Sequence, residues 1–443
     1  MKTFLLFNSP IYWESTNDSE NYLPPFGLGY IATYLEASGI HVELIDGVKK
    51  HLGAEDIIKI IEKKSPDFIG INIFTQNYDI VKFIIENISI KCVAFIGGQV
   101  VKSIYNDILQ WETKVDLIAI IGEGEYIIPS LVNKTCVEAP IQSMANNRAY
   151  IVNDNSVYFP KNISDIKINR DYLPDEIITN HYGEKEASII TSRGCPYNCA
   201  FCGGAHSLNL DIAIRNRTED SIVTEISEVL SIYPDVSSVR ILDDLFLKNK
   251  NSFISANNIF SRFTNLSWRG MIHTLSLLNS SDMIDILCKS NCRELFMGIE
   301  SGSEIIRERI NKLGTPSDVL FVAKTILESG IDLKGYFIFG FPNETKKDFD
   351  ATYNLAYKIK EISMKTEGSF RTSVFQFRPY HGTQLYNQLI QNNLLSHYSI
   401  KPNKDISVFP GRNQFNFSSG NYSCESDDLL NQYIIRTQKI MEE

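Results

Sequence analysis

Three cysteines crowd into one short segment of the sequence. Cys195, Cys199 and Cys202 stand in the order Cys-x3-Cys-x2-Cys, and an aromatic residue, Phe201, precedes the last of them. Three thiolates from one loop can bind three irons of a 4Fe–4S cluster and leave the fourth iron without a protein ligand. An open iron suits a chelating substrate with an amine and a carboxylate, whereas an electron-transfer ferredoxin would supply a fourth cysteine. The spacing therefore predicts a cluster that takes part in chemistry.

A zinc site is the alternative that the same residues leave open. His206 follows Cys202 after three residues and would complete a Cys3His set. Against zinc, the ligands span a strand-to-helix loop and lack paired Cys-x-x-Cys knuckles. Cysteines that merely pack in a core are a second alternative.

The cysteine motif resembles the signature of the radical-SAM superfamily. The resemblance implies that S-adenosylmethionine (SAM) chelates the open iron and that an electron from the cluster breaks its C–S bond to give a 5′-deoxyadenosyl radical. Six short apolar segments with helical patterns between them fit the (β/α)6 partial TIM barrel of that superfamily. We expect these strands at residues 187–191, 238–242, 266–272, 295–299, 334–339 and 373–377.

The resemblance also assigns roles at the strand ends, with Phe201 among the cofactor-binding residues. Asp243 and Asp244 would reach the methionyl amine of SAM, or they are an exposed pair that caps a turn. Arg269 would meet the SAM carboxylate, or it points into solvent. Glu300 would accept the ribose hydroxyls, with Ser301 beside it as a further contact or as part of a helix cap.

Two later segments complete the expected barrel site. Gly340 ends the fifth strand, where the family's backbone borders the adenine of SAM. Tyr380 and His381 follow the sixth strand and are the candidate catalytic residues that face the substrate. A histidine in a loop is also a common surface residue, and that alternative stays open for His381.

The first third of the chain alternates short apolar segments with helical patterns. The segments lie at residues 3–7, 42–45, 68–73, 92–96 and 117–121. Strands that are apolar almost throughout are buried on both faces, so the pattern predicts a doubly wound, Rossmann-like parallel sheet. Ligands bind such sheets beyond the carboxyl ends of the strands.

Polar and glycine residues follow three of those strands. They are Thr75, Asn77, Gly97, Gly98, Gln99, Gly122, Glu123, Gly124 and Glu125. With the segments 24–30 and 42–46, they resemble the cobalamin-binding domain that precedes many radical-SAM enzymes. The resemblance implies that they bind cobalamin, whereas the plainer alternative is that the glycines serve tight turns.

One feature departs from the best-known cobalamin domains. Their lower axial histidine needs the pattern Asp-x-His-x-x-Gly, but Val48 stands two residues after Asp46. His51 lies five residues on, at the start of the next helix, and we interpret it as a surface or capping residue. We therefore expect a cobalamin without a protein histidine on its lower face.

Composition excludes several classes of protein. The 443 residues include 43 Lys and Arg against 53 Asp and Glu, which gives a net charge of −10. This acidic balance argues against broad binding to nucleic acid or an anionic membrane surface. No apolar run approaches the ~18 residues of a membrane span. The short apolar start ends at Asn8, unlike a signal peptide, so a cytoplasmic location is expected.

The sequence predicts four regions and one favoured activity. They are a cobalamin domain (1–130), a connector (131–184) with a hairpin between 149–152 and 157–159, a radical-SAM domain (185–390) and a C-terminal extension (391–443) with a helix near 427–441. The resemblance implies methylation of an unactivated carbon in a small molecule, with electrons from a flavodoxin or ferredoxin. Ring contraction, cyclisation, or a sensor that binds cobalamin are the alternatives; a methylthiotransferase fits less well.

Overall fold

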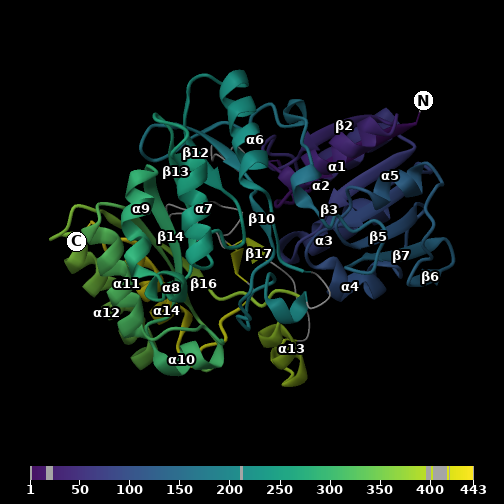
Figure 1. Cartoon of the computed structure of the whole chain (residues 1–443). Helices are drawn as coiled ribbons and strands as arrows, with labels where there is room; N and C mark the ends of the chain where they lie inside the picture. The colour runs from purple at the N-terminus through teal and green to yellow at the C-terminus, as the bar shows by residue number, and fades with distance from the viewer. Residues whose placement is uncertain are drawn as a thin grey trace.

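The structure is a computed structural model that describes residues 2–15, 23–209, 213–395, 401–402, 417–418 and 420–442. Two lobes lie side by side in Figure 1, an N-terminal lobe in purple and blue and a larger lobe in teal and green. Within the described residues, no helix combines the length and the apolar character that crossing a bilayer requires.

The N-terminal lobe contains the parallel sheet expected from the sequence. Its strand order is β2-β1-β3-β4-β5-β7-β6. The expected parallel strands are all present, as β1 (Thr3–Asn8), β2 (His41–Asp46), β3 (Phe68–Asn72), β4 (Val93–Gly97) and β5 (Asp116–Gly122). The strand β1 lies between β2 and β3, so the order of the strands reverses at β1. The loops that follow β1 and β3 therefore border a crevice at the carboxyl edge of the sheet.

Helices cover both faces of this sheet. The helices α1 (Phe26–Ala37) and α5 (Ile127–Val132) pack on one face, and α2 (Ala54–Lys64), α3 (Tyr78–Asn87) and α4 (Val101–Ile108) pack on the other. Apolar side chains on the inner faces of the helices are fully buried, which stabilises each element by roughly 1.5–3 kcal/mol per large side chain.

The sheet continues beyond the predicted end of the first domain at residue 130. The strand β7 (Asn147–Val152) pairs in parallel with β5, and β6 (Gln142–Met144) pairs with β7 in an antiparallel hairpin. The predicted hairpin between 149–152 and 157–159 is therefore wrong. The segment 149–152 pairs with β5 and β6 instead, while Phe159 packs as a buried side chain outside any strand.

The second lobe is a curled sheet of parallel strands. Its order is β16-β15-β14-β13-β12-β9-β8, which confirms the six predicted barrel strands and adds a short antiparallel strand at one edge. The strands are β8 (Ile178–Thr179), β9 (Lys185–Ile189), β12 (Val236–Ile241), β13 (Ser267–Ile272), β14 (Cys292–Glu300), β15 (Asp332–Phe339) and β16 (Phe370–Gln376).

Alternation along each barrel strand separates two environments. Leu295, Met297 and Ile299 of β14 belong to the core shared with the helices, so Glu294 and Phe296 face the barrel lumen. The helices of this lobe are α6 (Glu219–Ile232), α7 (Lys250–Phe260), α8 (Thr274–Leu278), α9 (Ile284–Lys289), α10 (Glu304–Arg309), α11 (Pro316–Glu328), α12 (Lys346–Ser363), α13 (Gln384–Gln391) and α14 (Asp427–Gln438).

Two short ribbons and the C-terminal helix complete the fold. The ribbon of β10 (Ser192–Arg193) and β11 (Arg215–Asn216) flanks the cysteine loop, and β17 (Lys401–Pro402) pairs with β18 (Phe417–Ser418). The predicted C-terminal helix is confirmed as α14, which packs against β16. In the C-terminal extension, residues 396–400, 403–416, 419 and 443 lie outside the described residues.

Candidate active site

The cysteine loop lies where β9 leaves the barrel. Hydrogen bonds to distant segments fix its backbone. The Ala200 N–H donates to the Ile310 carbonyl at 2.8 Å, and the Leu385 N–H donates to the Ala200 carbonyl at 3.0 Å. Cys195, Cys199 and Cys202 are free thiols on this loop. Three thiols on one fixed loop, with an open side, fit the donor set of a 4Fe–4S cluster.

The surroundings of these thiols do not resemble a zinc site. In the described part of the chain, no three His, Cys, Asp or Glu side chains lie close enough together to bind a single metal ion. His206, the ligand that zinc would need, is exposed. Burial raises the pKa of Cys202 to about 12, so this thiol keeps its proton until a metal displaces it.

Asp243 fixes the start of the cysteine loop. Its carboxylate accepts hydrogen bonds from the Thr191 N–H at 2.7 Å, the Thr191 hydroxyl at 2.6 Å and the Ser192 hydroxyl at 2.6 Å. The side chain is fully buried and both of its oxygens are engaged. In this structure the Asp243 carboxylate thus supports the loop itself, and its contact with SAM stays a prediction.

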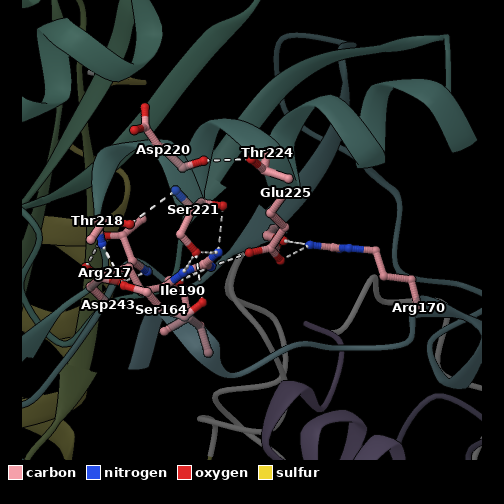
Figure 2. A network of polar contacts seen from close by, with 12 residues as sticks. Ser164, Arg170, Ile190, Arg217, Thr218, Asp220, Ser221, Thr224, Glu225 and Asp243 are labelled. Atoms are coloured by element: carbon pink, nitrogen blue, oxygen red, sulfur yellow. Dashed lines mark hydrogen bonds and ion pairs between the residues drawn. The ribbon is translucent and has the colours of Figure 1, made fainter. Parts of the chain in front are cut away.

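A second polar network holds the end of β9 from the helix side (Figure 2). Glu225 on α6 bridges Arg170 and Arg217, and the Arg217 guanidinium donates to the Ile190 carbonyl at 2.9 Å. All three charged side chains are buried. Because a buried carboxylate is stable only when its charge is matched, this network fixes the strand end from which the cysteine loop departs.

Two other carboxylates lie at the carboxyl ends of the barrel strands. Asp244 is exposed toward a cavity. Glu300 is buried, has a left-handed φ of 64°, and lies 3.2 Å from the Lys312 ammonium. A Cβ on Gly298 would lie 2.4 Å from the Glu300 carboxylate, so a larger residue there would displace that carboxylate. That Asp244 and Glu300 contact SAM stays a prediction.

Arg269 has a different environment from the one expected. Its guanidinium binds Glu186 at 2.6 Å and Glu294 at 2.8 Å, inside the barrel lumen. An arginine that is paired with two buried carboxylates has little charge left for the carboxylate of SAM. Arg269 nevertheless lines the cavity, and its contact with the SAM carboxylate stays a prediction.

Ser301 and Gly340 are also engaged within the protein. The Ser301 hydroxyl lies 3.1 Å from the Thr352 hydroxyl and accepts the Ser303 N–H at 3.1 Å. The Gly340 N–H donates to the Glu344 carboxylate at 2.7 Å. These polar groups shape the turns after β14 and β15, and the expected contacts of Ser301 and Gly340 with SAM stay predictions.

The glycines at the edge of the first sheet have two kinds of surroundings. Gly98 has a φ of 131°, and an added Cβ would lie 2.2 Å from the Ile73 carbonyl oxygen. Gly122 has a φ of 98°, and an added Cβ would lie 2.3 Å from the Val152 carbonyl oxygen. Both are needed for tight turns. A Cβ on Gly97 would meet nothing within 4 Å, so that position leaves open space beside a ligand.

The acidic residues of this edge connect the two lobes. Glu123 lies 3.1 Å from the Arg193 guanidinium and 2.5 Å from that of Arg215, and Glu125 lies 2.7 Å from Arg193. Burial alone would raise the pKa of Glu123, but the two guanidiniums outweigh it and lower that pKa. Their charges are thus matched across the lobes, while both residues line the large cavity, and their contact with cobalamin stays a prediction.

His381 lies in the contact between the lobes. Its backbone N–H donates to the Thr75 hydroxyl at 3.1 Å, and that hydroxyl lies 3.0 Å from the His381 Nδ1. Asn77 is buried and accepts the Phe74 N–H at 2.8 Å, which makes it part of the loop after β3. Thr75 and His381 nevertheless line the same cavity.

Stability should respond to pH through His381. Burial lowers its pKa to about 4, so between this value and about 6.5 the unfolded chain binds a proton that the folded chain does not. Stability therefore falls as pH drops through this window. His381→Gln should reduce the slope of the free energy of unfolding against pH by up to about 1.4 kcal/mol per pH unit. Urea unfolding at several pH values within this window measures that slope. An equal change in the exposed control His41→Gln would contradict the assignment.

A cavity of about 1820 Å³ runs between the lobes and into the barrel lumen. It brings together many of the predicted residues, which are Thr75, Asn77, Gly97, Gly98, Gln99, Gly122, Glu123, Gly124, Glu125, Phe201, Cys202, Asp244, Arg269, Tyr380 and His381. A neighbouring cavity of about 190 Å³ includes Cys195. The lining of neither cavity includes Cys199, Asp243, Glu300, Ser301 or Gly340.

Sequence reasoning missed several residues of the site. The Tyr197 ring stacks on His273 with centroids 3.8 Å apart, beside the cysteine loop. Burial and the Lys312 charge lower the pKa of His273 to about 3, so its imidazole is neutral. Neither His273 nor Lys312 belongs to a motif, and no spacing in the sequence points to them.

The geometry defines an iron–sulfur enzyme whose barrel faces a second, ligand-binding α/β domain. Profile comparison agrees: the family described as the Radical SAM superfamily matches residues 189–356, and the B12 binding domain matches residues 16–132. The chain is a cobalamin-dependent radical-SAM enzyme, so its cofactors are a 4Fe–4S cluster, SAM and cobalamin.

Curated relatives extend over most of the chain. A protein of Pyrococcus horikoshii named as an uncharacterized methyltransferase is 29% identical over 84% of this chain and 80% of its own. Cytidylyl-2-hydroxyethylphosphonate methyltransferase of Streptomyces wedmorensis is 22% identical over 87% and 82%. Anaerobic magnesium-protoporphyrin IX monomethyl ester cyclase of Rubrivivax gelatinosus is 24% identical over 80% and 65%.

Solved structures share the fold. The cobalamin-dependent SAM radical enzyme OxsB matches with a TM-score of 0.66 and 17% identity, over 98% of this chain and 65% of that chain. The radical SAM methyltransferase TsrM of Kitasatospora setae matches with a TM-score of 0.64 and 16% identity, over 91% and 79%. The present chain thus spans about two thirds of the length of OxsB.

The environment of Val48 allows a spectroscopic prediction. Val48 lines the large cavity two residues after Asp46, whereas His51 is not part of that lining. We expect the EPR spectrum of the protein with cobalt(II) cobalamin bound to lack nitrogen splitting from a protein histidine. His51→Ala should leave the spectrum unchanged. Splitting that disappears in His51→Ala would identify His51 as the cobalt ligand instead.

Proposed function

We propose that the protein transfers a methyl group from SAM to an unactivated carbon of a small molecule. Two of the curated relatives are named methyltransferases, and TsrM is a methyltransferase of the same fold. A carbon without an acidic proton cannot attack SAM as a nucleophile, which is the reason for an enzyme to combine radical chemistry with a cobalamin.

One observation carries this proposal. The large cavity is lined by Gly97 and Gln99 at the edge of the first sheet, by Cys202 of the cluster loop, and by the barrel lumen. A substrate in that cavity is accessible from both cofactor sites. If the two sites opened to separate cavities, a reaction that uses both cofactors on one substrate would need a large movement of the lobes.

The chain's own residues would bind and orient the reactants. When bound, the cluster supplies an electron for SAM cleavage, and the cobalamin supplies a carrier for the methyl group. Glu300 would accept the ribose hydroxyls of SAM, with its carboxylate held by Lys312, and Asp244 would bind the methionyl amine. Gly97 and Gln99 would border the cobalamin, and Tyr380 would face the substrate.

The electron is proposed to come from an external donor of the flavodoxin or ferredoxin type in the cytoplasm. The cluster loop supplies three cysteines and needs a reductant to begin each turnover. Radical SAM enzymes need an electron donor, which supports this part of the proposal. The type of donor is our own inference.

Incubation with methyl-labelled SAM and candidate small molecules tests the function. The cofactor-loaded protein should form 5′-deoxyadenosine and a labelled product, and neither should form when Cys195, Cys199 and Cys202 are replaced by alanine. An unlabelled product with 5′-deoxyadenosine would favour ring contraction or cyclisation, the class of reaction suggested by the cyclase relative. No 5′-deoxyadenosine under reduction would favour a cobalamin or redox sensor.

A further inference from the structure

The barrel lumen contains an arginine that the reaction described above does not use. In β12, Val239 and Ile241 belong to the core shared with the helices, so Arg240 between them faces the lumen. Its side chain lines the large cavity, and its guanidinium lies over the Phe296 ring at 5.1 Å from the centroid.

The charge of Arg240 is not matched by the protein. Its Nε is buried without a hydrogen-bond partner, and within the described ranges no ion pair reaches its guanidinium. Burial lowers its pKa, yet an arginine stays protonated in proteins. The Arg240 side chain as a whole is half-buried, but its Nε is cut off from solvent. Removing part of a cation from water without a direct partner costs stability, and an anionic ligand in the cavity would supply that partner.

The nearby carboxylates are already engaged with other cations. Glu186 binds Arg269 through both of its oxygens, at 2.6 Å each. Glu294 binds Arg269 and Arg371, each at 2.8 Å. Although burial alone would raise the pKa of Glu294, the bond and charge of Arg371 and the charge of Arg269 lower it. Around Arg240, the guanidiniums therefore outnumber the carboxylates, although the protein as a whole is acidic.

We propose that Arg240 binds an oxyanion group of the substrate, a carboxylate or a phosphate, in the barrel lumen. The proposal rests on the proposed function, since it assigns the substrate class of the same cavity. A guanidinium presents its donors in a planar fork that matches two oxygens of such a group. The Phe296 ring below keeps the guanidinium in place.

The other source of an oxyanion is the carboxylate of SAM itself. Arg240 precedes Asp244 by four residues, and Phe296 precedes Glu300 by the same number. At about 3.3 Å per residue, four residues of β14 place the Cα of Phe296, the ring under the guanidinium, roughly 13 Å along the strand from the Cα of Glu300, the residue proposed to bind SAM. This separation favours the substrate as the source, and the experiment measures both ligands.

The test compares Arg240→Met with the unaltered protein, each carrying its cluster and cobalamin. Inorganic phosphate is the probe, with chloride at matched ionic strength as the reference. Phosphate should raise the melting temperature of the unaltered protein and leave that of Arg240→Met unchanged. Without phosphate, Arg240→Met should melt about 2–4 °C higher, because an unmatched buried charge has been removed.

A matched control and a second ligand make the result decisive. Arg262→Met alters an exposed arginine that pairs with Asp220 on the surface, and it should keep the response to phosphate. Titration with SAM should give the same affinity in Arg240→Met as in the unaltered protein.

Several outcomes would overturn the proposal. One is an unaltered protein that does not respond to phosphate. A lower melting temperature of Arg240→Met without phosphate would make the residue structural. A tenfold loss of SAM affinity in this variant would assign the oxyanion to SAM. The labelled-methyl assay is independent of these readouts, so failure of the proposed function is recognised separately.

Discussion

Replacing Cys195, Cys199 and Cys202 together by alanine will remove the iron–sulfur cluster completely. All three thiols lie on the loop that follows β9, and this loop supplies the full set of protein ligands. The unaltered protein should contain about four irons per chain after anaerobic reconstitution, and the triple variant should contain none. Iron analysis and the visible absorbance of the cluster measure the difference.

The chain offers a matched control for this experiment. Cys136, Cys288 and Cys424 lie outside the loop and are half-buried or exposed, so their joint replacement by alanine also removes three thiols. That variant should keep the full iron content. Four irons in the first triple variant, or loss of iron in the control, would refute the assignment of the cluster ligands.

Replacing Glu300 by alanine should weaken SAM binding at least about tenfold, which corresponds to ~1.4 kcal/mol. The Glu300 carboxylate is buried at the end of β14, and each charge-assisted hydrogen bond to a ribose hydroxyl contributes roughly 1.5–3 kcal/mol. Its left-handed φ of 64° favours glycine or asparagine over glutamate, so a function must retain the carboxylate there. Equilibrium binding of SAM to the cluster-loaded protein measures the effect.

Three controls separate this role from a structural one. Cluster and cobalamin contents should be unchanged in Glu300→Ala. The exposed Glu304→Ala on α10 should bind SAM normally. If Glu300→Ala also binds SAM normally, the carboxylate serves only to match the charge of Lys312, and the assignment to the ribose is wrong.

Strands were the part of the fold that the sequence predicted best. Segments such as 68–73 and 295–299 are apolar almost throughout because parallel strands are covered on both faces. The strand β3 covers the first segment up to Asn72, and β14 contains the second. The cysteine loop was equally evident, since its spacing is itself the signal. Both features depend on residues that are neighbours in the sequence.

Pairing between distant charges could not be predicted in the same way. Arg269 and Glu186 are 83 residues apart, and the sequence does not indicate that β13 and β9, on either side of β12, bring their side chains together. The same holds for Glu123 and Arg215, which are 92 residues apart. A charged residue at a strand end therefore suggested a cofactor contact, while the fold had already supplied a partner.

The error at the connector has a related cause. Apolar residues at 149–152 and 157–159 flank a turn-like segment, which is the local pattern of a hairpin. The open edge of β5 gave the first segment a better partner than its neighbour in the sequence. A strand pairs with the sheet edge that is available in space, and one sequence does not reveal that edge.

The ion pairs of Glu123 and Glu125 have a consequence for how such enzymes can be recombined. Arg193 lies two residues before Cys195, and Arg215 pairs with it in the ribbon of β10 and β11. The ribbon that flanks the cysteine loop thus also forms ion pairs with the loop after β5 of the first sheet. A chimaera that takes one lobe from a relative without these charges would misalign its two cofactors, even if both lobes folded and loaded correctly.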